Sequence, residues 1–439
     1  MSRAASRSTW QNWGRTVRAQ PAKIAFPQST AEVTELIVDA AARATHIKAI
    51  GSGHSFTPIA VTDGVLVRLD RLSGIISADR ATGQVRVHAG TTLHALNHSL
   101  WQEGLALPNL GDIDTQTIAG AIGTGTHGTG ARFQGLASAV IGLRIVLADG
   151  SVVDCDADTE PDLFAAARIS LGALGIITEV TLQCVPAYLM LAVEAPGTLP
   201  VIRASLDEFM ESADHVEFYW FPHTDRVLTK RNTRISLTAA QQPLPRWRAW
   251  LDDEFLSNQV FGGLNWISAK APGIVPTLNA VSSRALSARS YTAPSFEVFA
   301  SSRKVRFKEM EIAFRQADLG AVLDELVGMV RGSRLRLPFP VEVRCAEADD
   351  AWLSTAYGQR TAYIAIHQYY RMPHQEYFDA FAEIAAGFGG RPHWGKMHPF
   401  EVSQLRNRVP RLDDFIAVRD RVDPQRRFAN AYLDRIIGP

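Results

Sequence analysis

The segment 49–58, AIGSGHSFTP, places one histidine, His54, among glycines and serines in a short loop. Glycines let a backbone approach a ligand closely, and successive N–H groups can bind an anion. The loop alone is compatible with a phosphate cradle, a metal ligand, a catalytic base or an ordinary turn. Other parts of the chain have to decide between these possibilities.

A second glycine-rich segment, GDIDTQTIAGAIGTGTHGTG at 111–130, contains another glycine-flanked histidine, His127. It includes a GxGxxG motif at 123–128, and Asp149 follows at about the spacing of a dinucleotide-binding acid. The context argues against a nicotinamide site, because the glycines that continue the motif favour no helix and Asp149–Gly150 indicates a β-hairpin turn. The long run of N–H groups suits a pyrophosphate, or a flat ring pressed against the backbone.

The strand-like sequence VEVR, residues 341–344, carries a carboxylate and a guanidinium two residues apart. Alternation places Glu342 and Arg344 on one face, opposite Val341 and Val343. Two interpretations remain open from the residues alone. The two side chains form a surface ion pair of little energetic value, or they face a pocket and orient a hydroxylated substrate.

Several further histidines need an interpretation. His393 and Lys396 belong to GGRPHWGKMH, whose density of polar and aromatic groups suits a site loop. His367 lies in IAIHQYY, where a structural role is the more common one. His94 and His98 have the spacing of a zinc motif, but the glutamate of HExxH is absent, so we expect solvent-facing histidines.

The composition excludes several classes of protein. Lys+Arg and Asp+Glu both number 45, so the overall charge gives no case for binding nucleic acid or an anionic membrane surface. The three cysteines lack CxxC spacing, which argues against a disulfide framework or a structural zinc site and fits the cytoplasm. No apolar segment resembles a signal peptide or a transmembrane helix, whereas peripheral association with a membrane stays open.

The order of the predicted elements gives an α+β protein of two or three domains. The first part alternates helices and strands, including a helix over Thr30–Thr45 capped by Thr30 and a strand over Ile47–Ile50. After Pro186 the pattern of predicted elements changes, and strand-like segments rich in aromatic residues appear. We therefore predict domains at 1–186 and 187–385, and a segment 386–439 that packs back on another domain.

Five motifs in order carry a resemblance to a known family: IGSGHS, GAIGTGTHGTG, SLGALGIITEVTL, VEVR and HWGK. Together with WQNWG near the start and DPQRRFANAYL near the end, they resemble the sugar-1,4-lactone oxidoreductases. These flavoenzymes of the vanillyl-alcohol oxidase type include gulonolactone and arabinonolactone oxidases, galactonolactone dehydrogenase and the related alditol oxidases. The resemblance implies a PCMH-type FAD-binding domain of two α+β subdomains, interrupted by an α+β cap domain that forms the substrate site.

The resemblance also implies which residues bind FAD. His54 matches the position that carries FAD covalently in many members, through the 8α carbon of the ring, and contacts it without a bond in others. No metal is needed. The predicted cofactor-binding residues are Ile50, Gly51, Ser52, Gly53, His54, Ser55, Gly120, Gly123, Thr124, Gly125, His127, Gly128, Gly130, Gly175, Ile177 and His393.

By the same resemblance, Glu342, Arg344, Lys396 and His367 form the catalytic set. The expected reaction oxidises the C2 hydroxyl of an L-gulono-, L-galactono- or D-arabinono-type 1,4-lactone by hydride transfer to flavin N5, giving an ascorbate-type product. Dioxygen, a dye or a cytochrome reoxidises the flavin, and Gly123 and Gly125 favour oxygen because they place no side chain beside the ring. The alternatives are an alditol oxidase acting on xylitol or sorbitol and, more remotely, a non-catalytic flavin-binding module.

Overall fold

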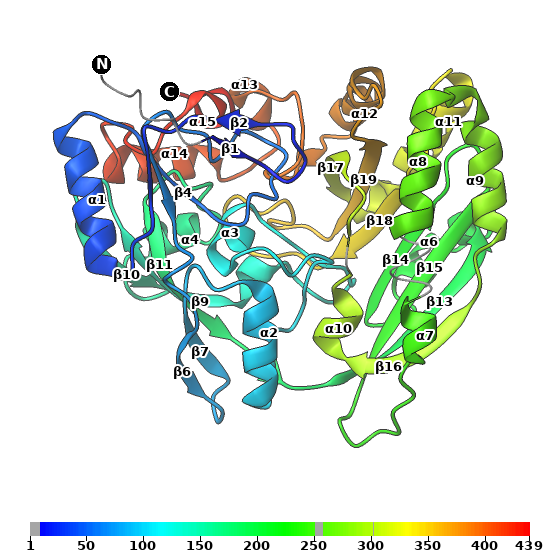
Figure 1. The fold of residues 1–439 in the computed structure, drawn as a ribbon, viewed down its shortest axis with the longest axis horizontal. Coiled ribbons are helices and arrows are strands. Elements are labelled where there is room, and N and C mark those ends of the chain that lie inside the picture. The colour runs from blue at the N-terminus through cyan, green and yellow to red at the C-terminus, as the bar shows by residue number, and fades with distance from the viewer. Residues whose placement is uncertain (1–8, 251–257, 302) are drawn as a thin grey trace, which may run out of the picture.

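The computed structural model describes residues 9–250, 258–301 and 303–439, and most of its strands form two smaller sheets and one large sheet (Figure 1). The first sheet is parallel, in the order β3-β5-β4, with β3 (Lys23–Ala25), β4 (Ile47–Ile50) and β5 (Val65–Arg68). The second is antiparallel, in the order β10-β9-β11-β7-β6, with β6 (Ile75–Asp79), β7 (Gln84–His88), β9 (Val140–Val146), β10 (Val152–Asp156) and β11 (Ile176–Gln183).

The large sheet has eight strands in the order β16-β13-β15-β14-β18-β19-β17-β20, and each neighbouring pair is antiparallel. Its strands are β13 (Leu189–Thr198), β14 (His215–Trp220), β15 (Arg226–Ile235), β16 (Arg289–Pro294), β17 (Phe307–Arg315), β18 (Val341–Ala346), β19 (Thr361–Tyr369) and β20 (Arg391–Pro392). Two short pairs complete the strands: β1 (Trp10–Gln11) with β2 (Arg18–Ala19), and β8 (Leu105–Ala106) with β12 (Val185–Pro186). The predicted α+β class is confirmed.

Helices pack around these sheets, and one continuous apolar core includes Val33, Val343 and Leu433. The first region contains α1 (Thr30–Ala42), α2 (Leu93–Gln102), α3 (Ile118–Gly123) and α4 (Pro161–Ala167). The large sheet is accompanied by α5 (Leu199–Ala204), α6 (Leu206–Met210), α7 (Arg246–Ala249), α8 (Phe261–Lys270), α9 (Val275–Arg284), α10 (Ser295–Phe299), α11 (Leu319–Gly332) and α12 (Gln375–Gly387). The chain ends with α13 (Val402–Leu405), α14 (Leu412–Val422) and α15 (Ala431–Ile437).

Helix α1 differs at both ends from the predicted helix over Thr30–Thr45. Ser29, and not Thr30, is the N-cap, because its hydroxyl accepts the Glu32 N–H at 3.1 Å while the Thr30 hydroxyl bonds that of Thr178. The helix ends at Ala42, and Ala44 then adopts a positive φ of 50°. A left-handed residue cannot continue a right-handed helix.

The predicted hairpin around Asp149–Gly150 is present, between β9 and β10. A two-residue type I′ turn, which this dipeptide favours, would need positive φ at both residues. Gly150 alone has it, and the connection spans residues 147–151, so the turn is of a longer kind.

The C-terminal helices return to the first region, where Figure 1 shows them beside the N-terminal elements. The Asn430 amide donates to the carbonyls of Pro58, Ile59 and Val61, and the Ile47 N–H donates to the Arg427 carbonyl. The segment after 386 also supplies β20 to the large sheet. The domain boundaries at 186 and 385 remain predictions.

Candidate active site

The first of two neighbouring cavities is built from the loop that follows β4, the N-terminal part of α3 and the start of β11. A Cβ on Gly51 would overlap the Thr117 hydroxyl, and Gly53 has a φ of 72°. Glycine therefore allows this loop to lie directly against α3. The predicted cofactor residues that line the cavity are Ile50, Gly51, Ser52, Gly53, His54, Ser55, Gly120, Gly123, Thr124, Gly175 and Ile177.

His54 has one ring nitrogen engaged and one left without a partner. Its Nε2 lies 3.2 Å from the Thr115 hydroxyl, and Trp13 stacks on the ring at 6.0 Å between centroids. Nδ1 is buried and has no hydrogen-bond partner among the described residues. Burial, and then the positive charge of Lys396, lower the pKa of His54. The imidazole is therefore neutral at physiological pH, and one nitrogen of this cavity-lining ring is unsatisfied.

Ser52 lines the cavity, and its hydroxyl has a partner within the protein. Its hydroxyl donates to the Thr115 carbonyl at 2.5 Å, so it ties the first loop to the segment before α3. The backbone N–H groups of the loop are the better candidates for contact with a phosphate.

Lys48 also lines the first cavity and was not predicted. Its amine is buried and donates to the carbonyls of Gly172 and Phe428, each at 2.9 Å. Burial lowers the pKa of Lys48 to about 7, although Asp423 and Asp434 oppose the shift. The sequence did contain an indication of this role, because Lys48 is the only charged residue in the short apolar strand IKAI.

The second cavity brings together every predicted catalytic residue. It shares Gln116 with the first cavity, so the two are adjacent. Its lining includes the predicted residues Glu342, Arg344, His367, Lys396, His127 and His393. These come from β18, β19, the 120–130 loop and the segment after β20, which the sequence separates by up to about 270 positions.

The pair on β18 faces this cavity and is buried, which settles the interpretation that the sequence left open. Arg344 forms ion pairs with Glu342 and Asp112, and with Glu217 at 2.9 Å. The Tyr219 hydroxyl donates to Glu342 at 3.1 Å. Burial, and the negative charges of Asp112 and Glu217, raise the pKa of Glu342 to about 7 against the opposing charge of Arg344.

Strand β17 adds two buried glutamates that the sequence analysis did not single out. Glu309 pairs with Lys396 at 2.5 Å, and its other oxygen lies 3.5 Å from His367 Nε2. Burial alone would raise the pKa of Glu309, but Lys396 and then His367 bring this pKa below its usual value. Two acidic residues alternating with apolar ones in FKEMEIAF were the signal for this face.

The backbone explains why the segment after β20 meets these glutamates. The His393 N–H donates to the Glu311 carbonyl at 3.0 Å, and the Met397 N–H donates to the Glu309 carbonyl at 2.9 Å. The segment therefore runs beside β17. This pairing places His393 next to Glu311, and Lys396 next to Glu309.

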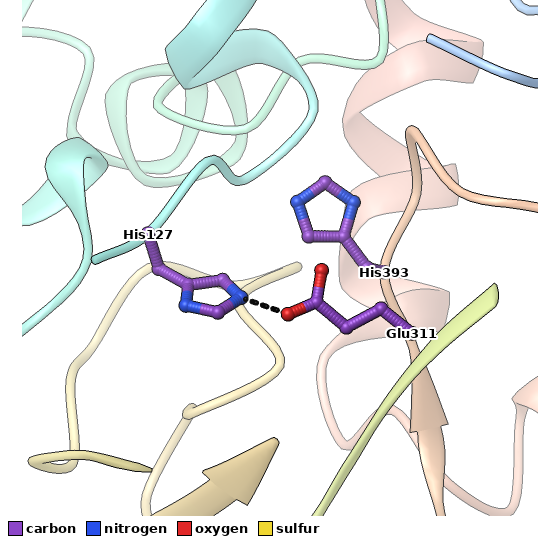
Figure 2. A group of neighbouring side chains, drawn as sticks. All are labelled: His127, Glu311 and His393. Atoms are coloured by element: carbon purple, nitrogen blue, oxygen red, sulfur yellow. Dashed lines mark ion pairs between the residues drawn. The ribbon is translucent and has the colours of Figure 1, made fainter. Parts of the chain in front are cut away.

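His127, Glu311 and His393 converge from three segments (Figure 2). His127 Nδ1 lies 2.9 Å from the Gly128 carbonyl, and Nε2 lies 3.0 Å from Glu311. Since both neighbours are acceptors, both nitrogens donate, and His127 is an imidazolium paired with the Glu311 carboxylate. Tyr363 stacks on this ring at 3.6 Å between centroids.

The same three groups lie close enough to suggest a metal centre, but the hydrogen bonds argue against one. The Gly395 N–H donates to His393 Nδ1 at 3.0 Å, so the proton of this neutral imidazole is on Nε2. Burial lowers the pKa of His393 to about 4, which keeps the ring neutral. His393 therefore presents a donor, and not a metal-binding lone pair, at Nε2.

Comparisons with known proteins match two parts of the chain to two protein families. Residues 21–156 match the FAD binding domain family, and residues 180–436 match the D-arabinono-1,4-lactone oxidase family. The chain belongs to the D-arabinono-1,4-lactone oxidase family. It is 42% identical to L-gulono-1,4-lactone dehydrogenase of Mycobacterium tuberculosis over 98% of this chain and 99% of the relative. It is 32% identical to L-gulonolactone oxidase of Mus musculus over 97% and 98% of the two chains.

The fold is also that of cholesterol oxidase from Brevibacterium sterolicum, with a TM-score of 0.81 at 19% identity over 98% of this chain and 96% of that one. The predicted family, PCMH-type fold, FAD cofactor and enzyme class are confirmed, so this member of the family is an FAD-dependent oxidoreductase that acts on a CH–OH group. The first cavity fits FAD, because its glycines leave room for close backbone contact and the buried His54 Nδ1 lacks a partner.

Three predicted FAD contacts line neither cavity. Gly125 faces Ile169 and Trp394, and a Cβ on Gly128 would overlap Leu110 and Asn109. Gly130 has a φ of 129° and donates its N–H to the Cys345 carbonyl at 2.9 Å. Packing and backbone conformation explain these glycines.

The structure also describes the segments that the sequence analysis considered for a nicotinamide site, a zinc site and a transmembrane helix. The GxGxxG motif follows helix α3 and not a strand, as the sequence context indicated. His94 is exposed and pairs with Asp114 at 2.7 Å, and His98 is exposed as well. Among the described residues, no helix is both long and apolar enough to span a bilayer.

Proposed function

We propose that this protein oxidises the C2 hydroxyl of an aldono-1,4-lactone of the L-gulono, L-galactono or D-arabinono type. The observation that carries the proposal is the buried set Glu342, Arg344, His367 and Lys396, which lines a cavity adjacent to the FAD cavity. Carboxylates, guanidinium and imidazole are the groups that recognise a ring bearing several hydroxyls. Bound FAD supplies the acceptor for the substrate hydride, at N5.

Glu342 is the proposed acceptor of the hydroxyl proton. A carboxyl whose pKa lies at about 7 is partly ionised at neutral pH, so it can take a proton and release it again. Arg344 and Lys396 hold positive charge on the same cavity and stabilise negative charge that develops on the substrate oxygen. Burial of the set strengthens these interactions, because little water screens them.

His367 is proposed to orient the substrate. Its Nδ1 donates to the Pro340 carbonyl at 3.1 Å, and its Nε2 lies 3.5 Å from Glu309 Oε1, so two acceptors hold the ring in place on the wall of the cavity. His393 lines the same cavity and offers a donor at Nε2.

A covalent bond between His54 Nδ1 and the 8α carbon of FAD is part of the proposal. Forming this bond would remove one hydrogen from the 8α methyl group and one from the imidazole; both would leave as protons, and the two electrons would go to the electron acceptor. We expect yellow colour to stay with the chain after denaturation in acid, and His54→Ala to release all flavin under the same treatment. Flavin lost from the unmodified protein would make His54 a contact only.

The proposed acceptor is dioxygen, with a dye or cytochrome c as the alternative. Gly123 lines the FAD cavity and adds no side chain there, which supports access of a small molecule. Anaerobic reduction by substrate followed by mixing with air should restore the oxidised spectrum within the turnover time. Slow reoxidation combined with rapid dye turnover would identify a dehydrogenase.

The substrate class is tested by anaerobic bleaching of the flavin. L-gulono-, L-galactono- and D-arabinono-1,4-lactone should bleach it, and xylitol and sorbitol should not. Faster bleaching by the polyols would assign an alditol oxidase, and no bleaching by any of them would leave a flavin-binding module.

A further inference from the structure

One tyrosine hydroxyl of strand β14, that of Tyr219, lies between two buried carboxylates. It is 2.9 Å from Glu217 Oε1 and 3.1 Å from Glu342 Oε1. A phenol carries one hydrogen, so this hydroxyl can donate to only one of the two oxygens at a time. Burial, and then the negative charges of Glu217 and Glu342, raise the pKa of Tyr219 well above its usual value, so the hydroxyl keeps its hydrogen at neutral pH.

The pairing of β14 with its two neighbouring strands fixes this arrangement. Tyr219 is directly opposite Glu342 across the β14–β18 pair, and Glu217 lies two residues earlier on the same face of β14. Across the β14–β15 pair, Glu217 is directly opposite Lys230. Both contacts of the hydroxyl therefore come from adjacent strands of one sheet.

The two carboxylates differ in their remaining partners. Glu217 Oε1 lies 2.9 Å from the Lys230 amine, and Glu217 Oε2 lies 2.9 Å from Arg344 Nε. Burial alone would raise the pKa of Glu217, but Lys230 and then Arg344 lower it to about 2, so Glu217 stays ionised. Glu342 has Arg344 and Tyr219 on Oε1, and within the described part of the chain its Oε2 has no hydrogen bond or ion pair. Since Glu342 lines the second cavity, Oε2 is the oxygen left for a substrate proton.

The charged groups that face Glu342 come from every element around it. They are Arg344 of β18, Glu217 of β14, Asp112 of the segment before α3 and Arg303 of the segment before β17, and His367 of β19 lines the same cavity. The pKa of Asp112 is held well below its usual value by Arg344 and Arg303 against the effect of burial, and the two arginines stay protonated. These four charges are therefore constant near neutral pH, whereas the hydrogen of Tyr219 can change its direction.

We propose that Tyr219 is a positioning residue for the proton acceptor: its hydroxyl donates to Glu342 while this carboxylate is ionised and turns to Glu217 when Glu342 takes up the substrate proton. The inference rests on the proposed role of Glu342. In the step itself, the O–H bond of the substrate breaks, its electron pair stays on the substrate oxygen, and the proton binds Glu342 Oε2. Tyr219 loses no proton, and only its hydrogen bond changes. A hydrogen bond to the ionised form lowers the pKa of a carboxyl group, so removing the hydroxyl should raise the pKa of Glu342.

Tyr219→Phe removes the hydroxyl and leaves the ion pairs in place, because Arg344 still contacts Glu342 and Lys230 still contacts Glu217. We expect the rising pH limb of anaerobic flavin reduction by the lactone to move upward by about one pH unit. The rate should then fall about tenfold at pH 6 and change by less than about twofold on the plateau at high pH. Loss of folding or of FAD would lower the rate at every pH and would not move the limb.

Tyr188→Phe is the matched control. Tyr188 is also buried, its hydroxyl donates to the Leu107 carbonyl at 3.3 Å, and it lines neither cavity. This variant loses a buried phenol hydroxyl in the same way, but it should keep the limb at the position of the unmodified protein.

An infrared titration of the substrate-free holoprotein follows the Glu342 carboxyl directly and is independent of turnover. The carbonyl band of a protonated carboxyl group that Glu342→Gln removes should appear as the pH falls through about 7. In Tyr219→Phe the midpoint of this band should lie about one pH unit higher.

Three results would overturn the proposal: an infrared midpoint that Tyr219→Phe leaves unchanged or lowers, an equal shift in Tyr188→Phe, and the absence of any band that Glu342→Gln removes. Failure of the proposed function looks different. If Glu342→Gln keeps the rising limb of flavin reduction while Tyr219→Phe shifts the infrared midpoint, Tyr219 controls the carboxyl, but Glu342 is not the proton acceptor.

Discussion

At the level of single residues, the ionisation of Glu342 makes a prediction about pH. A proton acceptor must be ionised, and the pKa of Glu342 is raised to about 7 by burial and by Asp112 and Glu217. The rate of flavin reduction by substrate should therefore rise with pH through about 7 and level off above it. Glu342→Gln should lower this rate by about 10²- to 10⁴-fold and remove the pH-dependent limb. Stopped-flow reduction under anaerobic conditions measures both effects.

The FAD content of the Glu342→Gln variant is the control, because Glu342 lines the second cavity and not the first. A variant that keeps the rising limb would show that another group accepts the proton. His367, which lines the same cavity, would then be the next candidate.

The His127–Glu311 pair makes a prediction about stability. Breaking a buried ion pair by removing one partner costs about 3–5 kcal/mol, because the other charge stays buried without compensation. His127→Gln and Glu311→Gln should each destabilise the protein by this amount, and the double variant by clearly less than the sum. Urea unfolding of the holoprotein measures the three values.

His94→Gln gives the comparison for this cycle, because His94 and Asp114 form an exposed pair of the same kind. Its effect should stay below about 1 kcal/mol. Strictly additive losses in the buried pair would mean that His127 and Glu311 do not interact energetically.

At the level of elements, the contact between the first loop and α3 depends on Gly51. A Cβ there would overlap the Thr117 hydroxyl, which caps α3 by accepting the Gly120 N–H at 3.3 Å. Gly51→Ala should separate the loop from α3 and reduce the FAD content of the purified protein by more than about tenfold. Absorbance at the flavin band relative to protein measures the change.

Gly328→Ala in helix α11 is the matched control, because a Cβ at Gly328 would meet nothing within 4 Å. Alanine is favoured over glycine in a helix by about 1 kcal/mol, so this variant should keep its flavin and gain slightly in stability. Equal flavin content in both variants would contradict the close packing of the loop.

The elements show what the sequence could predict. Glycine spacing and strand alternation act locally, so they placed the first loop, the hairpin at Gly150 and the pair Glu342 and Arg344 correctly. The partners of that pair could not be predicted, because Asp112 and Glu217 reach it through long-range contacts. Two of the predicted FAD contacts, Gly128 and Gly130, line neither cavity and remain predictions. Both belong to the glycine-rich motif, and neighbouring backbone also leaves no room for a side chain there.

At the level of the whole molecule, Lys48 joins three distant parts of the chain beneath the FAD cavity. Its amine, on β4, binds the Gly172 carbonyl of the loop before β11 and the Phe428 carbonyl of the C-terminal segment. The C-terminal segment therefore supports the wall of the cofactor cavity, although it is more than 370 residues away in sequence. A lysine is unusual at this position, because burying its charged amine costs free energy.

Because burial lowers the pKa of Lys48, the free energy of unfolding should depend on pH. The pKa of Lys48 is lowered by burial from 10.5 to about 7, so between these values the unfolded chain binds more protons than the folded one. Stability contributed by Lys48 should therefore rise as the pH rises above 7, by about 2 kcal/mol up to pH 9. Lys48→Met lacks this contribution and leaves both carbonyls without a donor. Urea unfolding of both proteins at pH 7 and pH 9 should show a difference that shifts by this amount in favour of the unmodified protein. A difference that is independent of pH would show that Lys48 stays charged in the folded protein, with Asp423 and Asp434 as its compensating partners.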